Sequence, residues 1–247
     1  MENRILITGG SGNLGKKIID SNLFKNIYYP TSKSINILNF KKLKEFIKKN
    51  KINLIIHCAA IARMKECEKN IEKAVKTNIE GTLNIVNVIN SLQARKKIKL
   101  IYISSDAVYP GIKGNYSETH SLKPFNVYGW SKVASEFIVR TLDKFLIIRT
   151  RFFNKNKILF KYSATNIYTS TIEIDKLVLI IYKLVNKNVS GIINVGEKKI
   201  SDYKNYKKFK KEIKPCSKNK ILKEINFKIA TNASLNINLL NKILCQR

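Results

Sequence analysis

Residues 4–15 read RILITGGSGNLG, an apolar run that leads directly into a glycine-rich loop. The apolar run is short and unbroken, which predicts a buried strand. Gly9, Gly12 and Gly15 form the pattern G-x-x-G-x-x-G, and residues 13–24 then have helical spacing. Glycines between a strand and a helix allow a tight turn and let a pyrophosphate approach the N-terminus of the helix. We therefore predict a dinucleotide-binding loop, and an ordinary glycine turn is the alternative.

Short apolar runs and amphipathic segments continue to alternate up to about residue 150. Further strands are predicted at residues 27–29, 53–57, 99–103 and 145–149, and further helices at residues 40–49, 71–91 and 125–142. Apolar strands separated by helices indicate a parallel sheet that is covered on both faces. The expected fold is α/β, a Rossmann-type doubly wound parallel sheet whose ligands bind at the carboxyl ends of the strands.

The long helix predicted at residues 71–91 has apolar residues at spacings that suit one buried face. These residues are Ala74, Val75, Ile79, Leu83, Val86 and Ile89. We expect this face to pack against the sheet.

The alternation loosens after about residue 150. A helix is predicted at residues 174–185, a strand at 191–195, and a basic helix or loop at 203–211. No internal repeat or low-complexity linker separates this part from the rest of the chain. We therefore predict a dinucleotide-binding domain over residues 1–150 and a small substrate-binding lobe over residues 151–247, partly packed onto the sheet.

The composition limits the class of protein. The chain has 247 residues, of which 44% are hydrophobic, and this fits a globular protein with one large domain. The opening segment, MENRILITGG, does not resemble a signal peptide, and no run of eighteen apolar residues predicts a membrane span. The four cysteines and two histidines lack the spacing of metal ligands. We expect reduced thiols, a cytoplasmic location, no metal site and no membrane association.

The net charge of +30 has two explanations. One is binding to a nucleic acid or another anionic surface, and the other is compositional drift toward Lys, Asn and Ile. The lysines are spread along the chain, and no aromatic–basic signature of an RNA-binding module is present. We therefore expect no specific nucleic-acid partner, although a basic surface can help to attract a phosphorylated ligand.

A tyrosine and a lysine stand four residues apart in YGWSK, at residues 128–132. At this spacing Tyr128 and Lys132 lie on one face of the predicted helix. A phenol has an ordinary pKa of about 10, and a neighbouring ammonium lowers this pKa toward the range useful for acid catalysis. Ser105, at the end of the fourth strand, is suited to hydrogen-bond a substrate carbonyl. A surface Tyr and Lys is the alternative, but the glycine loop and the Ser-Ser-Asp at 104–106 favour a catalytic site.

Several motifs resemble those of extended short-chain dehydrogenases/reductases, and among these the dTDP-4-dehydrorhamnose reductases are most similar. The matching segments are NIEGTLN at 78–84, SSDAVY at 104–109, YSETHSLKPFNVYGWSKVASE at 116–136, LIIRTRFF at 146–153 and NASLN at 232–236. LIIRTRFF is similar to the R-T-S-W-x-x segment of the reductases, with Phe152 in place of the tryptophan. The chain is also shorter than the family after Phe153, and NIYTST at 166–171 stands for a longer family segment. These departures leave the sugar nucleotide open.

The resemblance implies a reductase that uses NADPH to reduce the 4-keto group of a nucleotide-activated deoxy sugar, as in dTDP-rhamnose and polysaccharide biosynthesis. In this family pattern Tyr128 protonates the carbonyl oxygen, Ser105 orients the carbonyl, and Lys132 tunes Tyr128 and binds the nicotinamide ribose. The implied cofactor-binding residues are Gly9, Ser11, Gly12, Asn13, Leu14, Ser32, Lys33, Ala59, Ala60, Tyr128 and Lys132. The implied substrate-binding residues are Asp106, Asn126 and Phe152.

The segment after the second strand bears on the choice of cofactor. It reads YYPTSKSIN at residues 28–36 and contains no acid of the kind that holds the ribose hydroxyls of NAD. Ser32 and Lys33 are suited to meet a 2′-phosphate, so NADP(H) is favoured over NAD(H). The alternative is that Lys33 is one more solvated lysine.

Other functions on the same scaffold stay open at this point. One is a sugar-nucleotide epimerase or epimerase-reductase, and another is a non-catalytic NADP-binding subunit similar to the regulatory subunit of methionine adenosyltransferase. Ser105, Tyr128 and Lys132 argue against the non-catalytic alternative. Homodimer formation is also left open.

Overall fold

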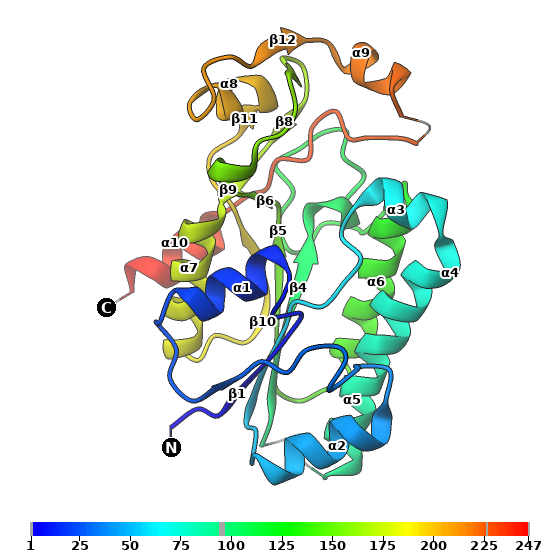
Figure 1. Ribbon diagram of the computed structural model, residues 1–247. Coiled ribbons are helices and arrows are strands. Elements are labelled where there is room, and N and C mark those ends of the chain that lie inside the picture. The colour runs from blue at the N-terminus through cyan, green and yellow to red at the C-terminus, as the bar shows by residue number, and fades with distance from the viewer. Residues whose placement is uncertain (1, 94–96, 226, 247) are drawn as a thin grey trace.

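The computed structural model describes residues 2–93, 97–225 and 227–246. Its centre is a six-stranded, wholly parallel sheet in the order β10-β5-β4-β3-β1-β2 (Figure 1). The strands are β1 (Ile5–Thr8), β2 (Ile27–Tyr28), β3 (Leu54–His57), β4 (Lys99–Ser105), β5 (Phe145–Thr150) and β10 (Gly191–Val195). The chain runs from β1 outward to β2 and then returns past β1 to β3, so the winding reverses between β1 and β3. The predicted doubly wound α/β fold is confirmed.

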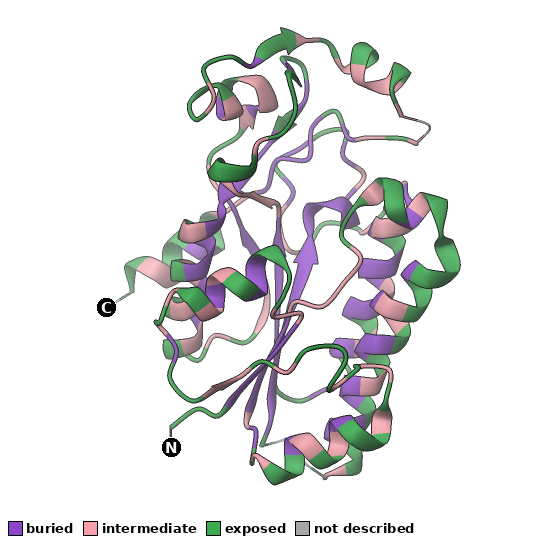
Figure 2. Ribbon diagram, in the orientation of Figure 1, coloured by how far each residue is buried: buried purple, intermediate pink, exposed green. Residues whose placement is uncertain are grey.

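Helices cover both faces of the sheet (Figure 1). One face carries α1 (Asn13–Asp20), α7 (Ile174–Asn186) and α10 (Asn238–Cys245), and the other carries α2 (Phe40–Lys49), α5 (Gly81–Ser91) and α6 (Val127–Val139). Successive strand residues point to opposite faces, so Ile5 and Ile7 pack in one apolar core and Leu6 in the other. Figure 2 shows the central strands buried between these helix layers.

The segment predicted as one helix at residues 71–91 contains a π-helical turn. α3 (Met64–Lys69) and α4 (Ile71–Ala74) precede π-helical residues Val75–Glu80, and α5 follows directly. A π-turn has i→i+5 hydrogen bonds and often occurs near functional sites.

The predicted buried face of this segment is wrong at two positions. Val75 and Leu83 are 37% and 40% exposed. The polar residues Asn78 and Thr82 are buried instead, because each has hydrogen-bond partners inside the fold. A prediction based on apolar residues alone cannot identify a polar side chain that is buried because it is hydrogen-bonded in the core.

The part of the chain after β5 divides between the sheet layers and a lobe at the carboxyl ends of the strands (Figure 1). α7, β10 and α10 pack against the sheet. The remaining elements are β6 (Phe152–Phe153), β7 (Tyr162–Ala164), β8 (Tyr168–Thr169), β9 (Ile172–Glu173), β11 (Ile200–Ser201), α8 (Asp202–Lys207), β12 (Lys214–Cys216) and α9 (Lys218–Lys223). Short 3₁₀ turns occur at Asp106–Val108 and Lys155–Lys157. Within the described ranges, no helix combines the length and apolar character needed to cross a membrane.

Candidate active site

The glycine loop joins β1 to α1 and lies against the loop that follows β3. Gly9 has a φ of +72°, and a Cβ at this position would be 2.6 Å from the backbone nitrogen of Ala59. A Cβ on Gly15 would be 2.3 Å from the carbonyl oxygen of Gly9. Both contacts are with backbone, so these positions require glycine. The loop therefore leaves bare backbone at the N-terminus of α1, an arrangement that fits a pyrophosphate.

Two cavities adjoin the glycine loop, and Gly9 lines both. The larger, of about 590 Å³, is also lined by the predicted residues Ser11, Ser32 and Ala59. The smaller, of about 370 Å³, is also lined by the predicted residues Gly12, Asn13, Leu14, Ala60, Ser105, Asp106, Tyr128, Lys132 and Phe152. Residues from the first, third and fourth strand ends and from α6 thus meet at one edge of the sheet.

Lys33 is exposed and lines neither cavity. Lys16, in the first turn of α1, lines the larger cavity together with Ser32. The acid Asp20 lines the same cavity from the end of α1. The sequence analysis did not identify Lys16 as a cofactor-binding candidate. The signal was available, because Lys16 directly follows Gly15 and so lies at the end of α1 that is nearest the glycine loop.

The Tyr128 phenol and the Ser105 hydroxyl line the same cavity, and the Ser105 hydroxyl donates a hydrogen bond to Oδ1 of Asp106 at 3.2 Å. Asn126 caps the helix that carries Tyr128, because its side-chain oxygen accepts a hydrogen bond from the Gly129 N–H at 2.7 Å. The Ser105 hydroxyl oxygen accepts a hydrogen bond from the Ala107 N–H at 3.1 Å. Burial raises the pKa of Tyr128 to about 12. The shift is upward, so the expected lowering of the Tyr128 pKa by the neighbouring ammonium is wrong, because burial outweighs the other influences; the phenol holds its proton at neutral pH.

Lys132 lies one helical turn after Tyr128, with its side chain buried. Its ammonium donates a hydrogen bond to the carbonyl oxygen of Ile103 at 2.8 Å. The same nitrogen lies 4.7 Å from the ring centroid of Tyr102 and 5.9 Å from that of Tyr128. Burial lowers the pKa of Lys132 to about 8. Tyr128 and Lys132 thus lie on one face of α6, as predicted. The sequence did not indicate that the ring of Tyr102 also lies next to the Lys132 ammonium, at a distance that allows a cation–π interaction.

Only two of the three predicted substrate-binding residues line the smaller cavity. Asp106 and Phe152 line the smaller cavity, whereas Asn126 does not, since its side chain is used to cap α6. Arg151 was missed by the sequence reasoning, yet it lines this cavity. Its Nε lies 2.7 Å from Oδ2 of Asp106, in an ion pair whose carboxylate is 2% exposed.

Two polar residues on neighbouring elements fix the loop that borders the cavity. Asn78, in the π-turn, accepts a hydrogen bond from the Ile61 N–H at 2.8 Å and donates to the Ser131 hydroxyl at 2.9 Å. Glu68 accepts a hydrogen bond from the Val127 N–H at 2.8 Å, at the start of α6. These contacts hold the loop after β3 against the helix that carries Tyr128.

His57 is a buried structural residue. Its Nδ1 lies 2.7 Å from the Thr8 hydroxyl and its Nε2 lies 3.1 Å from the Thr82 hydroxyl. Burial lowers the pKa of His57 to about 3, so the ring is neutral at physiological pH. In the part of the chain that the structure describes, no three His, Cys, Asp or Glu side chains group as metal ligands.

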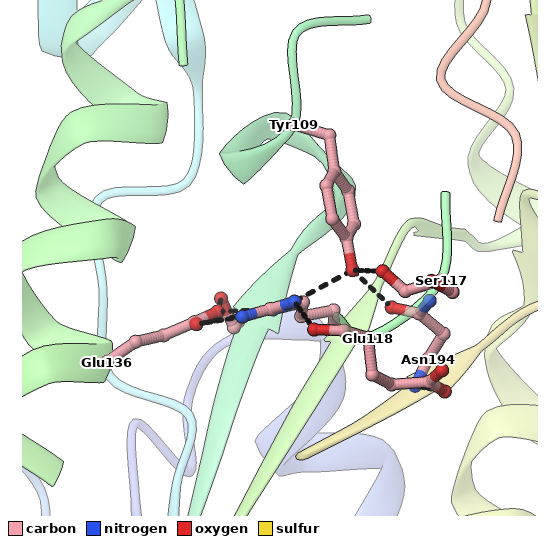
Figure 3. Close-up of polar contacts among 7 residues, drawn as sticks. Tyr109, Ser117, Glu118, Glu136 and Asn194 are labelled. Atoms are coloured by element: carbon pink, nitrogen blue, oxygen red, sulfur yellow. Dashed lines mark hydrogen bonds and ion pairs between the residues drawn. The ribbon is translucent and has the colours of Figure 1, made fainter. Parts of the chain in front are cut away.

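A buried ion pair between β5 and α6 lies at the centre of a hydrogen-bond network close to the cavity (Figure 3). Arg149 is 2.7 Å from Glu136, which also accepts a hydrogen bond from the Ser104 hydroxyl at 2.5 Å. Arg149 also donates to the Tyr109 hydroxyl at 2.8 Å, and Tyr109 in turn donates to Asn194 at 3.0 Å. The network links β4, β5, β10 and α6 below the candidate site.

The family model described as RmlD substrate binding domain matches residues 3–163. The chain belongs to this family. The predicted resemblance to dTDP-4-dehydrorhamnose reductases is thereby confirmed.

Individual relatives of this RmlD-family chain include both enzymes and a regulatory protein. The dTDP-4-dehydrorhamnose reductase of Aggregatibacter actinomycetemcomitans is 31% identical over 60% of this chain and 50% of its own length. Methionine adenosyltransferase 2 subunit beta of Xenopus laevis is 33% identical over 54% of this chain and 41% of its own length. The chain thus spans about half the length of the curated relatives it matches.

Solved structures match the RmlD-family chain over a larger part of their length. The dTDP-4-dehydrorhamnose reductase of Bacillus anthracis, in complex with NADP, is 24% identical with a TM-score of 0.85, over 98% of this chain and 93% of that one. A hypothetical dTDP-4-dehydrorhamnose reductase of Sulfolobus tokodaii is 28% identical with a TM-score of 0.85, over 98% and 95%. The fold therefore agrees across both the sheet and the lobe.

Proposed function

We propose that the chain is an NADPH-dependent reductase of the 4-keto group of a nucleotide-activated deoxy sugar. One observation carries the proposal: Ser105, Tyr128 and Lys132 line the same cavity as Gly12 and Asn13 of the glycine loop. Relatives named dTDP-4-dehydrorhamnose reductase and, in Streptomyces niveus, dTDP-4-keto-6-deoxy-D-glucose reductase support it.

The chemistry divides between the cofactor and the side chains. The bound cofactor supplies hydride to the carbonyl carbon. Tyr128 donates a proton to the carbonyl oxygen, and the Ser105 hydroxyl donates a hydrogen bond to the same oxygen. Reduction needs a protonated phenol, and the raised pKa keeps Tyr128 protonated at neutral pH, although it also makes the phenol a weaker acid. Lys132 holds the nicotinamide ribose and stabilises the phenolate after proton transfer.

The cofactor proposal rests on the bare backbone of the glycine loop, which suits a pyrophosphate. The residues proposed to hold the cofactor are Gly9, Ser11, Gly12, Asn13, Leu14, Ala59, Ala60, Tyr128 and Lys132. Ser32 is proposed to meet the 2′-phosphate of NADPH, with Lys16 in place of Lys33 as the cation. The NADP complex of the similar Bacillus anthracis structure supports this preference.

Residues 1–150 are proposed to bind the cofactor and residues 151–247 to complete the substrate site. A cavity of about 570 Å³ in the lobe is lined by Tyr162, Tyr206 and Lys220 and gives room for the nucleotide part of the substrate. Asp106 and Phe152 are proposed to contact the sugar. Four free cysteines agree with a cytoplasmic location, and homodimer formation is a further proposal to test by light scattering.

A panel of 4-keto sugar nucleotides with dTDP, UDP, GDP and CDP, followed by NADPH absorbance, tests the activity. We expect stoichiometric NADPH oxidation with at least one member. Tyr128→Phe should abolish turnover while NADPH still binds within about twofold of the wild-type Kd, because only the transferred proton is lost. Full turnover by this variant would exclude Tyr128 as the proton donor, and product formation without NADPH loss would indicate an epimerase.

The second candidate is a non-catalytic NADP-binding regulatory subunit. It is favoured by the relatives named methionine adenosyltransferase 2 subunit beta, at 28–33% identity. This candidate predicts NADPH binding, no oxidation with any keto sugar, and a stable complex with a methionine adenosyltransferase catalytic subunit. The reductase predicts the opposite on the last two points.

A further inference from the structure

One surface of the lobe exposes apolar side chains. Leu159 is 85% exposed, and Phe160 and Phe209 are 42% and 44% exposed. Leu159 and Phe209 line neither the two cavities at the glycine loop nor the cavity in the lobe. The proposed cofactor and substrate sites therefore leave these two side chains uncovered. Exposed apolar residues that gather on one surface mark a site of interaction with a partner.

The three side chains come from two segments, residues 154–161 and 203–211, which lie side by side. The Lys210 ammonium donates a hydrogen bond to the carbonyl oxygen of Phe160 at 3.3 Å. The ring of Phe160 also lies 4.8 Å from that of Tyr206. The two segments thus form one surface, which we call the lobe patch. Figure 1 shows α8, which contributes to it, at the end of the molecule opposite the N-terminus.

The lobe patch carries a local excess of positive charge. Nearly half of the residues in segments 154–161 and 203–211 are lysines and none is an acid, whereas Lys and Arg make up 47 of the 247 residues of the chain. The lysines are Lys155, Lys157, Lys161, Lys204, Lys207, Lys208, Lys210 and Lys211. Within the described ranges, none of them forms an ion pair with an Asp or Glu side chain. Compositional drift along the whole chain does not account for this excess, which favours an anionic partner.

Apolar side chains among lysines are the combination that binds a membrane surface with anionic lipids. The lysines lie near the lipid phosphates, and the apolar side chains enter the boundary between headgroups and acyl chains. A nucleic acid would instead need free aromatic faces for base stacking. Leu159, the most exposed apolar side chain, has no such face, and the ring of Phe160 meets Tyr206 edge to face.

We propose that the lobe patch docks the protein on an anionic lipid surface. The expectation of no membrane association rested on the lack of a spanning segment, and docking at the surface requires none.

The test measures sedimentation of the full chain with phosphatidylcholine vesicles that contain about one-third phosphatidylglycerol. We expect binding at low ionic strength, much weaker binding at about 1 M salt, and no binding to vesicles of phosphatidylcholine alone. A variant with Lys155, Lys157 and Lys211 changed to Gln should bind roughly 100-fold more weakly, since each lysine near an anionic surface contributes about a factor of five. Leu159→Ser should bind roughly tenfold more weakly, because it removes an apolar side chain that enters the lipid boundary.

The matched control changes Lys41, Lys48 and Lys49 of α2 to Gln. These exposed lysines lie outside the lobe patch, and their loss lowers the net charge by the same amount. The control should bind the vesicles within about twofold of wild type, because charges farther than a Debye length from the lipid are screened. Far-UV circular dichroism checks that each variant is folded.

Three results would overturn the proposal. One is no binding to the anionic vesicles, and another is an equal loss of binding in the lobe-patch and α2 variants, which would indicate dependence on net charge alone. The third is tighter binding to single-stranded DNA that Leu159→Ser leaves unchanged, which would assign the lobe patch to a nucleic acid. None of these measurements needs NADPH or a keto sugar, so their outcome is independent of the reductase assignment.

Discussion

The glycine loop and the lobe beyond β5 both border ligand-sized cavities, but they depend on different kinds of contact. At the glycine loop, backbone meets backbone, and a Cβ on Gly9 would lie 2.6 Å from Ala59. In the lobe, side chains form the walls, as where the rings of Phe160 and Tyr206 lie 4.8 Å apart. Backbone contacts restrict the residue type directly, whereas a wall of side chains can be rebuilt by substitution. The structure of the glycine loop can therefore be predicted from its residue types, whereas the walls of the lobe cavity cannot.

The largest expected effect concerns the buried network of Figure 3, which links β4, β5, β10 and α6 beneath the candidate site. Arg149→Met leaves Glu136 charged and unpaired, which should lower the free energy of unfolding by about 3–5 kcal/mol. Urea denaturation at pH 7 measures this change, with exposed Arg4→Met as the control that should stay within about 0.5 kcal/mol. A loss below about 1 kcal/mol would contradict a structural role for the pair.

A second prediction sharpens the contrast through two glycines that share a positive φ. Gly9→Ala meets backbone at 2.6 Å, whereas an added Cβ on Gly191, at a φ of +95°, has no atom within 4 Å. Gly191→Ala should lower the free energy of unfolding by about 1–2 kcal/mol through backbone strain alone. Gly9→Ala should cost more than this and should also weaken NADPH binding by at least about tenfold, as measured by nucleotide fluorescence. If both variants lowered the free energy of unfolding equally, backbone crowding at Gly9 would be contradicted.

A third prediction concerns Lys132, whose pKa is lowered by burial to about 8 from 10.5. Below pH 8 the folded chain carries the full cost of burying the ammonium, and that cost disappears as the pH rises to 10.5. Lys132→Met should therefore raise the free energy of unfolding by up to about 3 kcal/mol at pH 7, with the gain shrinking toward pH 10.5. Urea titrations at several pH values measure it, and a gain that grows with pH would contradict the sign.

The smallest expected effect separates two lysines on the cofactor side. Lys16 lines the larger cavity with Ser32, and Lys33 does not. Lys16→Ala should weaken NADPH binding by about tenfold and leave NADH binding nearly unchanged, because a charge-assisted bond to the 2′-phosphate is lost. Lys33→Ala should change neither Kd by more than about twofold. The reverse pattern would restore Lys33 as the phosphate ligand.

Much of the sheet and of the loop chemistry could be predicted from sequence for a physical reason. Parallel strands that are buried on both faces are apolar throughout, and the loop at Gly9 tolerates no side chain. Both conditions restrict the residue types and can therefore be recognised in the sequence. The Tyr128–Lys132 spacing is fixed by helix geometry and is equally visible.

The rest depended on choices that the sequence does not record. Asn126 has the residue type of a sugar ligand and of a helix cap, and only the fold shows that it caps α6. Lys16 and Lys33 are identical in type, and the path of the chain decides which one reaches the cavity. Arg151 lies among many basic residues, and its importance emerges only from its distance to Asp106.

The π-turn at Val75–Glu80 has a consequence for insertions and deletions. Deleting one residue there would replace the i→i+5 hydrogen bonds of the π-turn by the i→i+4 bonds of an α-helix. The flanking helices would keep nearly the same relative rotation, because the wider turn accommodates the extra residue, but the turn that holds Asn78 against Ile61 and Ser131 would be lost. The extra residue of this turn is thus part of the site, and the segment should tolerate many substitutions more readily than the loss of a single residue.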